Sequence, residues 1–224
     1  MAWDEWMRGP EVEPSLYAAD FSRLGEQLET LLEAGARIFH FDVGDAHFVP
    51  PVTIGPIVLQ WIAPIVHRAG GWLDCHLMVD EPAKHLEAVV EAGGDSVTFH
   101  YEVANDVESL AGQARALGLG VGLAFNPESE PEEVASVVGP VDLVLCMSIH
   151  PGYSGQAFMP EAFGRVERLR DALPPGKHIQ VDGGVGADNI PRLRSAGADL
   201  LVAGTSVFRA ENLADSYRRL AALT

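Results

Sequence analysis

The sequence predicts a (β/α)8 barrel, a single α/β domain in which eight parallel strands are each followed by a helix. Eight short apolar runs alternate with eight segments whose apolar residues recur at helical spacing. Most of these runs are apolar at consecutive positions, as in a parallel sheet that is buried on both faces. Units of about 28 residues fit a closed barrel better than a doubly wound open sheet, which is the alternative.

The individual elements follow from these patterns in order along the chain. The expected strands occupy residues 12–17, 37–43, 72–79, 96–100, 120–125, 141–147, 178–181 and 200–203. The first helix carries a stripe of leucines, is capped by Asp20 or Ser22, and ends at Gly35. The later helices are expected over residues 54–67, 81–92, 106–117, 131–138, 161–172, 188–196 and 207–222.

No linker or shift in composition divides the chain, so we expect one catalytic barrel over residues 12–224. Residues 1–11 are expected to be an extension that is either disordered or placed at an oligomer interface. This extension is acidic and aromatic and has no apolar segment, so we do not expect a signal peptide. Cys75 and Cys146 lie in apolar runs, which predicts buried thiols and a cytoplasmic protein.

The charge of the chain excludes some classes of partner. It has 224 residues, of which 47% are hydrophobic, and 32 acidic residues against 15 basic ones give a net charge of -17. Such a chain repels nucleic acid and anionic membranes, and no apolar run reaches the length of a membrane span. An anionic substrate would therefore need local positive potential from backbone amides or a metal ion.

Histidines and aspartates stand at the ends of three expected strands, where a barrel carries its chemistry. His40 and Asp42 are two residues apart and so share one side of their strand. His76 lies on the next strand, and Asp182 ends the seventh. Two imidazoles and two carboxylates suit one Zn²⁺, Fe²⁺, Mn²⁺ or Co²⁺ ion better than Ca²⁺. The alternative is that the histidines are hydrogen-bonded core residues and the aspartates cap loops.

Glycines form a second group, in three adjacent loops that follow expected strands. These loops contain Gly152 and Gly155, then Gly183 and Gly184, and finally Gly204. Backbone N–H groups approach phosphate closely at glycine, and the loops after strands 7 and 8 often hold phosphate in such barrels. The glycines therefore predict a phosphate pocket, although each pair taken alone is ordinary turn chemistry.

Longer motifs run from about Pro14 to Phe208 and resemble one enzyme family. They include Pro14-Ser15-Leu16, His40-Phe41-Asp42, His76-Leu77-Met78-Val79, Pro151-Gly152-Tyr153-Ser154-Gly155-Gln156, Val181-Asp182-Gly183-Gly184 and Gly204-Thr205-Ser206-Val207-Phe208. On these motifs the sequence resembles the ribulose-phosphate 3-epimerase family. The resemblance implies a TIM barrel of the ribulose-phosphate-binding type and a cytoplasmic isomerase of carbohydrate metabolism in the pentose phosphate pathway. It also implies a homo-oligomer, because members of the family commonly self-associate.

The resemblance further implies the reaction, which inverts C3 of a ketose phosphate, most simply converting D-ribulose 5-phosphate to D-xylulose 5-phosphate. His40, Asp42, His76 and Asp182 would hold one divalent metal ion (Zn, Fe, Mn or Co). Asp42 and Asp182 would also be catalytic, exchanging the proton on opposite faces of a metal-stabilised 2,3-enediolate. We expect one aspartate to be ionised while the other is protonated.

By the same resemblance, a further set of residues would contact the sugar phosphate, and residues 150–158 would form a flexible lid. The substrate-binding set is Ser15, His76, Met78, Met147, Gly152, Ser154, Gly155, Gly183, Gly184, Gly204 and Thr205. Core packing is an equally good interpretation of the two methionines.

Four positions depart from the family pattern. Gly44 stands in place of a methionine, so that either a neighbouring side chain fills the space or the pocket accepts a different ketose phosphate. Ala46 replaces glycine, which suggests a changed loop because alanine resists positive φ. Ala18 replaces a frequent serine, and His150 stands where asparagine or an acidic residue is common. The alternatives are an epimerase or isomerase for another sugar phosphate, such as D-allulose 6-phosphate, and a catalytically weak phosphate-binding barrel.

Overall fold

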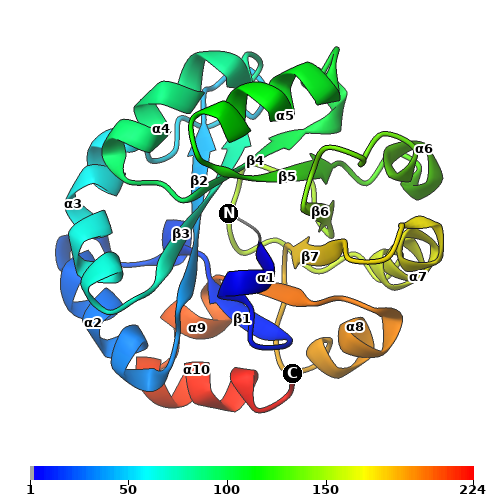
Figure 1. Cartoon of the computed structure of the whole chain (residues 1–224). Helices are drawn as coiled ribbons and strands as arrows, with labels where there is room; N and C mark the ends of the chain where they lie inside the picture. Colours follow the sequence, from blue (N-terminus) through cyan, green and yellow to red (C-terminus); the bar gives the residue numbers. More distant parts are fainter. Residues whose placement is uncertain (1–2) are drawn as a thin grey trace.

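The computed structural model describes residues 3–224 and confirms the predicted barrel (Figure 1). Its eight strands are all parallel and pair in the order β1-β8-β7-β6-β5-β4-β3-β2. A parallel bridge between Ser15 and His40 connects the two ends of the sheet and closes the ring. The strands are β1 (Glu11–Pro14), β2 (Ile38–Gly44), β3 (Trp72–Met78), β4 (Ser96–His100), β5 (Gly120–Phe125), β6 (Leu143–Met147), β7 (His178–Asp182) and β8 (Leu200–Ala203).

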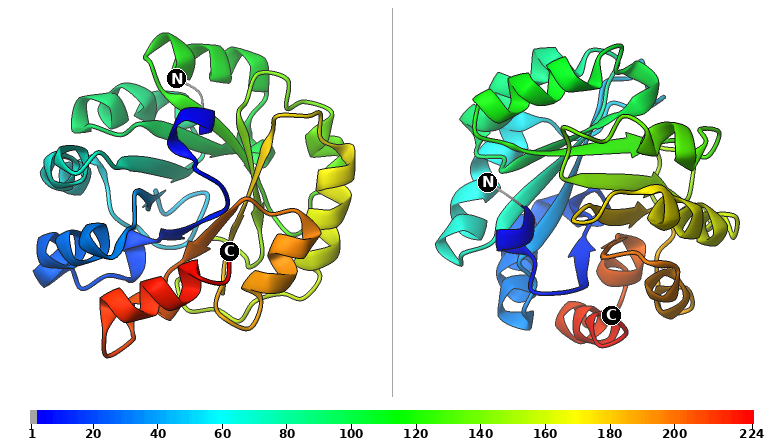
Figure 2. Two further views of the ribbon diagram at one scale, coloured as in Figure 1. Left: turned by 60° about the horizontal axis from the view of Figure 1, so that its bottom comes forward. Right: turned by 45° about the vertical axis from the view of Figure 1, so that its right-hand side comes forward.

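Helices surround the strands, as the three views of the ribbon show (Figures 1 and 2). They are α1 (Trp3–Trp6), α2 (Leu24–Ala34), α3 (Pro56–Arg68), α4 (Leu86–Ala92), α5 (Val107–Ala116), α6 (Pro131–Ala135), α7 (Ala162–Ala172), α8 (Ile190–Ala196), α9 (Thr205–Phe208) and α10 (Leu213–Ala221). Short 3-10 turns are η1 (Leu16–Ala18), η2 (Phe21–Arg23), η3 (Pro82–His85) and η4 (Tyr101–Val103). Within residues 3–224, no helix has the length and apolar character that crossing a membrane requires.

Several expected boundaries differ from those of the structure. The helix expected over residues 81–92 consists of η3 and α4, that expected over 131–138 ends at Ala135, and the sixth strand begins at Leu143 instead of residue 141. The first strand ends at Pro14 instead of residue 17, because the chain turns into η1 directly afterwards. The single helix expected over residues 207–222 is two helices, α9 and α10. Asn212 separates them, since its side chain accepts a hydrogen bond from the Asp215 backbone N–H at 3.0 Å and caps the start of α10.

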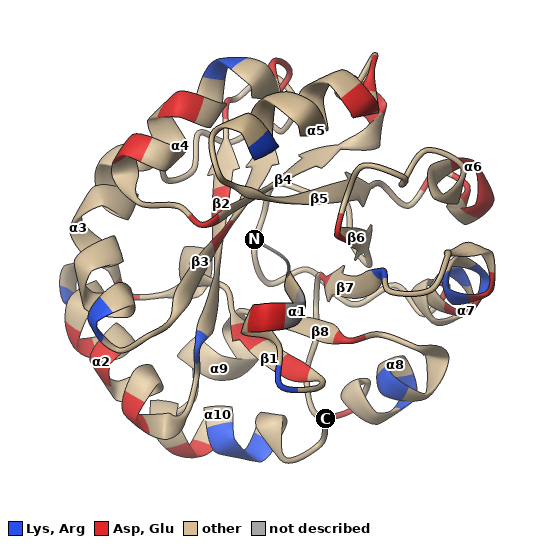
Figure 3. Ribbon diagram, viewed as in Figure 1, with Lys and Arg blue, Asp and Glu red and all other residues tan. Residues whose placement is uncertain are grey.

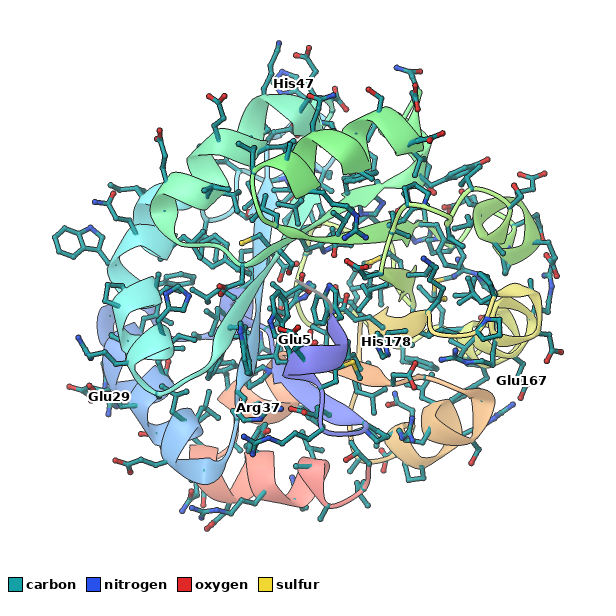
Figure 4. All side chains as sticks on the ribbon, viewed as in Figure 1. Glu5, Glu29, Arg37, His47, Glu167 and His178 are labelled. Carbon is teal, nitrogen blue, oxygen red and sulfur yellow. The ribbon has the colours of Figure 1, made fainter. Side chains whose placement is uncertain are left out.

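The N-terminal end of the barrel is filled by α1, which lies near the middle of the ring in Figure 1. Trp3 and Trp6 are each 1% exposed and pack with barrel residues that include Ile38 and Leu143. The Trp6 ring stacks on Trp72 with centroids 5.7 Å apart. Figure 4 labels Glu5 and Arg37 at this end of the molecule. The two tryptophans of the N-terminal extension therefore contact the barrel of their own chain.

A polar layer lies deeper in the barrel and links four strands. Gln180 Nε2 on β7 donates to Glu13 Oε2 on β1 at 2.5 Å and to Asp74 Oδ2 on β3 at 2.9 Å. Asp74 Oδ1 also accepts from Ser96 Oγ on β4 at 2.7 Å. All four side chains are buried. This network supports the site above it, because Asp74 also contacts His40.

Candidate active site

The structure brings together the four residues expected to bind a metal. His40 and Asp42 lie on β2, His76 lies opposite Asp42 on β3, and Asp182 ends β7. Each offers one ligand atom, and these atoms all lie within 4.8 Å of one another. Asp42 Oδ1 is 3.3 Å from His40 Nε2 and 3.1 Å from His76 Nδ1. Parallel strands that end at one rim have thus brought residues far apart in sequence to one point.

The two imidazoles are each held from one side. His40 Nδ1 is 3.1 Å from Asp74 Oδ2. Its buried Nε2 lies 3.3 Å from Asp42 Oδ1 but makes no well-aligned hydrogen bond with any described residue. A buried nitrogen without a well-aligned partner is costly, and a cation placed between it and the carboxylate would satisfy it. His76 Nε2 lies 2.8 Å from His100 Nε2, so that its Nδ1 faces Asp42. One imidazole thus turns Nε2 and the other Nδ1 toward the cluster.

The two aspartates differ in their tendency to ionise. Burial alone would raise the pKa of Asp42, but the positive charge of His40 and hydrogen bonds from His40 and His76 lower it overall. Burial raises the pKa of Asp182 to about 7, and the negative charge of Asp42 adds to this effect. The two pKa shifts therefore run in opposite directions, that of Asp42 toward the ionised form and that of Asp182 toward the protonated form.

A cavity opens beside the aspartates at the carboxyl ends of the strands. Asp42 and Asp182 line it together with ten of the eleven residues expected to bind substrate; His76 is the exception, because it is buried beneath the surface of the cavity. Ser15 Oγ donates to Asp42 Oδ2 at 2.8 Å and so fixes the orientation of that carboxylate. Tyr17, Ile149, Val185 and Val202 also line the cavity and had not been expected, whereas the other two lining residues, Pro151 and Tyr153, belong to the expected lid.

Glycines make up much of one side of the cavity, and two of them are required by close contacts. Gly183 has φ of +117°, and a Cβ there would lie 2.4 Å from Ile149 Cγ1. Gly184 has φ of +63°, and a Cβ there would lie 2.6 Å from the Phe158 backbone nitrogen. The described residues that line the cavity include neither lysine nor arginine. An anion would therefore meet backbone N–H groups and no cationic side chain on this wall.

The segment expected to be a lid runs across the cavity between β6 and α7. Gln156 Nε2 donates to the backbone oxygens of His150 and Tyr153, at 2.8 Å and 2.9 Å. A Cβ on Gly152 would lie 3.3 Å from Pro51 Cδ and from Val49 Cβ, which places this segment against the loop after β2. The lid therefore touches the loops after β2 and β7 on two sides of the cavity.

With this geometry in place, a family model identifies the chain. The model described as the ribulose-phosphate 3 epimerase family matches residues 11–208. The chain belongs to the ribulose-phosphate 3-epimerase family. It is therefore an enzyme of the isomerase class, an epimerase, and the family is metal-dependent.

Relatives in several organisms are similar over nearly their whole length. Ribulose-phosphate 3-epimerase of Eremothecium gossypii is 37% identical over 214 residues, which cover 92% of this chain and 89% of that protein. The enzyme of Synechocystis is 39% identical over 210 residues, covering 92% and 90%. The cytoplasmic isoform of Oryza sativa subsp. japonica is 39% identical over 204 residues, covering 89% and 88%.

Solved structures share the fold at low sequence identity. Orotidine 5'-phosphate decarboxylase of Pyrococcus horikoshii OT3 has a TM-score of 0.70 at 15% identity and covers 95% of this chain and 98% of that one. A 3-hexulose-6-phosphate synthase has a TM-score of 0.69 at 17% identity and covers 95% and 99%. These similarities concern the barrel alone.

The departures from the family pattern have structural explanations. At Gly44 a Cβ would lie 2.8 Å from Val49 Cγ2 and 3.0 Å from Thr53 Cγ2. Neighbouring side chains thus fill the space beside Gly44, which is the first of the two outcomes expected there. Ala18 lies against Gly204, because a Cβ added to Gly204 would lie 3.3 Å from the Cβ of Ala18. His150 Nε2 is 2.6 Å from Glu128 Oε1 at the surface and does not line the cavity.

The expectation for Ala46 is wrong. This alanine has φ of +61°, which is the left-handed conformation that alanine was expected to avoid. The surrounding loop imposes this conformation, because Ala46 N–H donates to the Pro51 backbone oxygen at 3.3 Å and Asp45 pairs with Val52. Asp45 Oδ1 also accepts from the backbone N–H groups of His47 and Phe48. These bonds offset the steric cost of a Cβ at positive φ.

Proposed function

We propose that this epimerase interconverts D-ribulose 5-phosphate and D-xylulose 5-phosphate by inverting C3. The observation that carries the proposal is the pair of carboxylates on β2 and β7, which line one cavity and favour opposite protonation states. Inversion requires a base on one face of the substrate and an acid on the other. The lysine-free glycine loops beside the pair supply backbone N–H groups for the phosphate end of such a substrate.

We further propose that His40, Asp42, His76 and Asp182 hold one Zn²⁺, Fe²⁺, Mn²⁺ or Co²⁺ ion. The fit rests on the unpartnered buried Nε2 of His40 and on a donor set of two nitrogens and two carboxylates. When bound, such an ion supplies positive charge that stabilises the negative charge developing on the oxygens of an enediolate.

The residues of the chain divide the proton transfers between them. The ionised Asp42 carboxylate removes the C3 proton from one epimer, while the Ser15 hydroxyl holds its Oδ2 in place. The protonated Asp182 delivers a proton to the opposite face, and the reverse reaction starts from the exchanged protonation states. Met78 and Met147 border the cavity and limit the access of water to the reacting carbons.

Asp182→Asn tests this assignment, because asparagine can neither deliver nor remove the proton. We expect epimerisation to fall by about 10²–10⁴-fold, the usual contribution of a positioned acid or base, while the circular dichroism spectrum is retained. Asp42 can still exchange the C3 hydrogen of one epimer with deuterium from solvent without inverting it. Undiminished epimerisation by this variant would contradict the two-aspartate mechanism.

The same deuterium experiment on the unaltered enzyme separates the alternative functions. A catalytically weak phosphate-binding barrel exchanges no hydrogen at C3, whereas an epimerase does. Steady-state assays with D-ribulose 5-phosphate and D-allulose 6-phosphate then decide the sugar. The filled space beside Gly44 supports the pentulose, since it offers no extra room for a longer chain. A higher kcat/KM with D-allulose 6-phosphate would favour the second sugar.

We also propose that the enzyme forms a homo-oligomer through the outer face of α3. Val52, Ile57 and Trp61 are 76%, 67% and 74% exposed in and beside this helix. Residues 46–73 contain neither aspartate nor glutamate, and Figure 3 shows α3 without acidic residues while such residues mark helices around it. Two copies that each carry a charge of -17 repel one another, except where their contact surface is apolar and free of acids.

Light scattering on a sizing column tests the surface. We expect an oligomer at micromolar concentration and a monomer for Trp61→Glu, which adds a like charge to both sides of the contact. Leu117→Glu is the matched control, because Leu117 is 38% exposed at the end of α5. A monomeric wild-type chain, or equal effects of the two substitutions, would contradict the proposal.

The enzyme is further proposed to act in the cytoplasm on a small-molecule sugar phosphate, without nucleic acid or membrane as partner. Cys75 and Cys146 are buried free thiols, as suits a reducing compartment. One relative is named a cytoplasmic isoform.

A further inference from the structure

A chain of hydrogen bonds approaches the His76 ring through its second nitrogen. His76 Nε2 lies 2.8 Å from Nε2 of His100, the last residue of β4. His100 Nδ1 lies 3.2 Å from Oε2 of Glu102 in η4. The other oxygen, Oε1, accepts from the Asn126 backbone N–H at 2.7 Å and from Ser129 Oγ at 2.5 Å. Both imidazoles are fully buried, whereas the Glu102 side chain is 24% exposed, so that water does not reach the contact between the two rings.

The chemistry of the donors and acceptors determines where each hydrogen lies. A carboxylate only accepts, so the hydrogen between His100 and Glu102 belongs to His100 Nδ1. A neutral His100 then offers a lone pair at Nε2. The contact between the two Nε2 atoms needs one hydrogen, which must therefore come from His76 Nε2. With a cation held by the cluster, neutral His76 therefore presents its lone pair at Nδ1, the atom that lies 3.1 Å from Asp42 Oδ1; without the cation, the Asp42 carboxylate competes for a hydrogen at the same nitrogen.

The ring of His100 is also fixed in place by packing. It lies between Phe48, whose centroid is 4.5 Å away, and His76, whose centroid is 5.0 Å away. Phe48 belongs to the loop after β2 that carries Ala46 and Val49. Neither His100 nor Glu102 lines the substrate cavity, so neither can act on the sugar directly.

We infer that His100 and Glu102 are positioning residues that keep the hydrogen of His76 on Nε2 and leave its Nδ1 lone pair facing the metal site. The inference rests on the proposed metal-dependent function. Hydrogen-bond partners of this kind commonly fix the tautomer of a metal-binding histidine. His40 has a related arrangement with the nitrogens exchanged, since Asp74 lies 3.1 Å from its Nδ1 and its Nε2 faces Asp42 in the metal-binding cluster.

The first test reads the hydrogen positions directly in Zn²⁺-loaded wild-type protein labelled with ¹⁵N-histidine, because in metal-free protein the Asp42 carboxylate also attracts a hydrogen to His76 Nδ1. Long-range ¹H–¹⁵N correlation spectra distinguish a protonated ring nitrogen from an unprotonated one. We expect His76 to be protonated at Nε2 and not at Nδ1, and His100 at Nδ1 only. A hydrogen on His100 Nε2 in place of Nδ1 would overturn the inference without any variant being needed.

Glu102→Gln should reverse the whole chain of hydrogen bonds. The Asn126 N–H and the Ser129 hydroxyl continue to donate to an oxygen, so the amide oxygen takes the Oε1 position and the NH₂ group faces His100. His100 must then accept at Nδ1 and donate from Nε2, which moves the hydrogen of His76 to Nδ1. We expect the spectrum to show this change and the affinity for Zn²⁺, measured against a chromogenic chelator, to fall about 10–100-fold.

Ser129→Ala is the matched control, because it removes one hydrogen bond to Glu102 but leaves the carboxylate and its contact with His100. We expect the wild-type tautomer and wild-type Zn²⁺ affinity. Equal loss of affinity in both variants, or an unchanged His100 tautomer in Glu102→Gln, would overturn the inference. The readouts are independent of turnover, so they remain valid if the protein proves inactive on D-ribulose 5-phosphate, a result that would refute the proposed function alone.

Discussion

Gly44 lies at the end of β2, two residues beyond Asp42, and faces the loop that carries Val49 and Thr53. Its backbone N–H donates to Thr53 Oγ1 at 2.6 Å, and Thr53 Oγ1 in turn donates to the Asp42 backbone oxygen at 2.7 Å. The loop therefore holds the backbone of Asp42, the aspartate proposed to remove the C3 proton. The absence of a side chain at position 44 is what lets the loop approach so closely.

Gly44→Ala should consequently destabilise the protein. The added Cβ would lie 2.8 Å from Val49 Cγ2 and 3.2 Å from the Pro51 backbone oxygen, so that the loop must shift. We expect the free energy of unfolding to fall by about 1–3 kcal/mol, as for other overpacked sites, in urea denaturation. Gly112→Ala is the control, because a Cβ there has no neighbour within 4 Å and alanine favours the interior of α5. Equal stability of the Gly44 variant would mean that the loop yields freely.

Arg209 brings a positive charge close to the phosphate loop. A Cβ on Gly155 would lie 3.7 Å from Arg209 Nη2 and 3.6 Å from Thr205 Cγ2, although Arg209 itself does not line the cavity. The residue follows α9 directly. Its charge therefore adds to the potential of the backbone amides at the place where the anionic end of a substrate would lie.

Arg209→Gln should raise KM with little change in kcat, because the lost attraction acts on binding and not on proton transfer. We expect about a two- to fivefold rise, the size of a partly screened charge contact. The difference should shrink as salt is added. Arg219→Gln on α10 provides a charge-matched control. A large fall in kcat, or an effect that is insensitive to salt, would show that Arg209 acts in another way.

Among the elements, α1 is short but packs two tryptophans against the end of the barrel. Its two indoles are 1% exposed, and Arg37 Nη2 donates to the Trp6 backbone oxygen at 2.5 Å. Arg37 also lies over the Trp72 ring, 5.2 Å from its centroid. A four-residue helix is not stable alone, so its position depends on these tertiary contacts.

Trp6→Ala should lower the free energy of unfolding by about 3–5 kcal/mol, the usual cost of removing a buried tryptophan side chain. Thermal denaturation followed by circular dichroism measures the change. Trp61→Ala is the control for the size of the side chain, since Trp61 is 74% exposed. It should have little effect when the protein is dilute enough to be monomeric. Similar losses of unfolding free energy in the two variants would mean that the packing of α1 against the barrel does not stabilise the protein.

The whole molecule combines a high negative charge with a site for a cation. Asp42 and Asp182 belong to the metal-binding cluster, and Asp74 contacts its His40. Burial and the charge of Asp74 raise the pKa of Glu13, which lies below the cluster, well above its usual range. Binding of a divalent ion to the folded state relieves part of this repulsion. The ion should therefore stabilise the fold as well as support the reaction.

Removal of metal by a chelator should abolish activity and lower the unfolding midpoint, and Zn²⁺, Mn²⁺, Co²⁺ or Fe²⁺ should restore both. At a free concentration one hundred times Kd the ion adds about 2.7 kcal/mol to the free energy of unfolding. Asp182→Asn, which lacks one carboxylate ligand, should gain less from the same concentration. Equal midpoints for metal-free and metal-loaded enzyme would argue against a site built from these four residues.

The sequence was sufficient for those features that depend on strand order alone. Every strand of a parallel barrel ends at the same rim, so His40, Asp42, His76 and Asp182 could be grouped without coordinates. Other features depend on contacts between distant segments. The positive φ of Ala46 is imposed by Pro51 and Asp45, and Tyr17 enters the cavity because the first strand ends three residues early.

The sequence by itself determined the eight-fold barrel and the placement of the two aspartates and the glycines at or after the ends of strands. Periodicity and the ends of strands are local properties, which is why they can be predicted from the sequence. Only the tertiary structure decided that Trp3 and Trp6 lie under the barrel and that side chains fill the space beside Gly44. It alone placed His100 in hydrogen-bonding contact with His76, and it alone shifted the pKa values of Asp42 and Asp182 in opposite directions. These outcomes depend on distances between segments far apart in the chain, on which burial, hydrogen bonding and electrostatic interaction all depend.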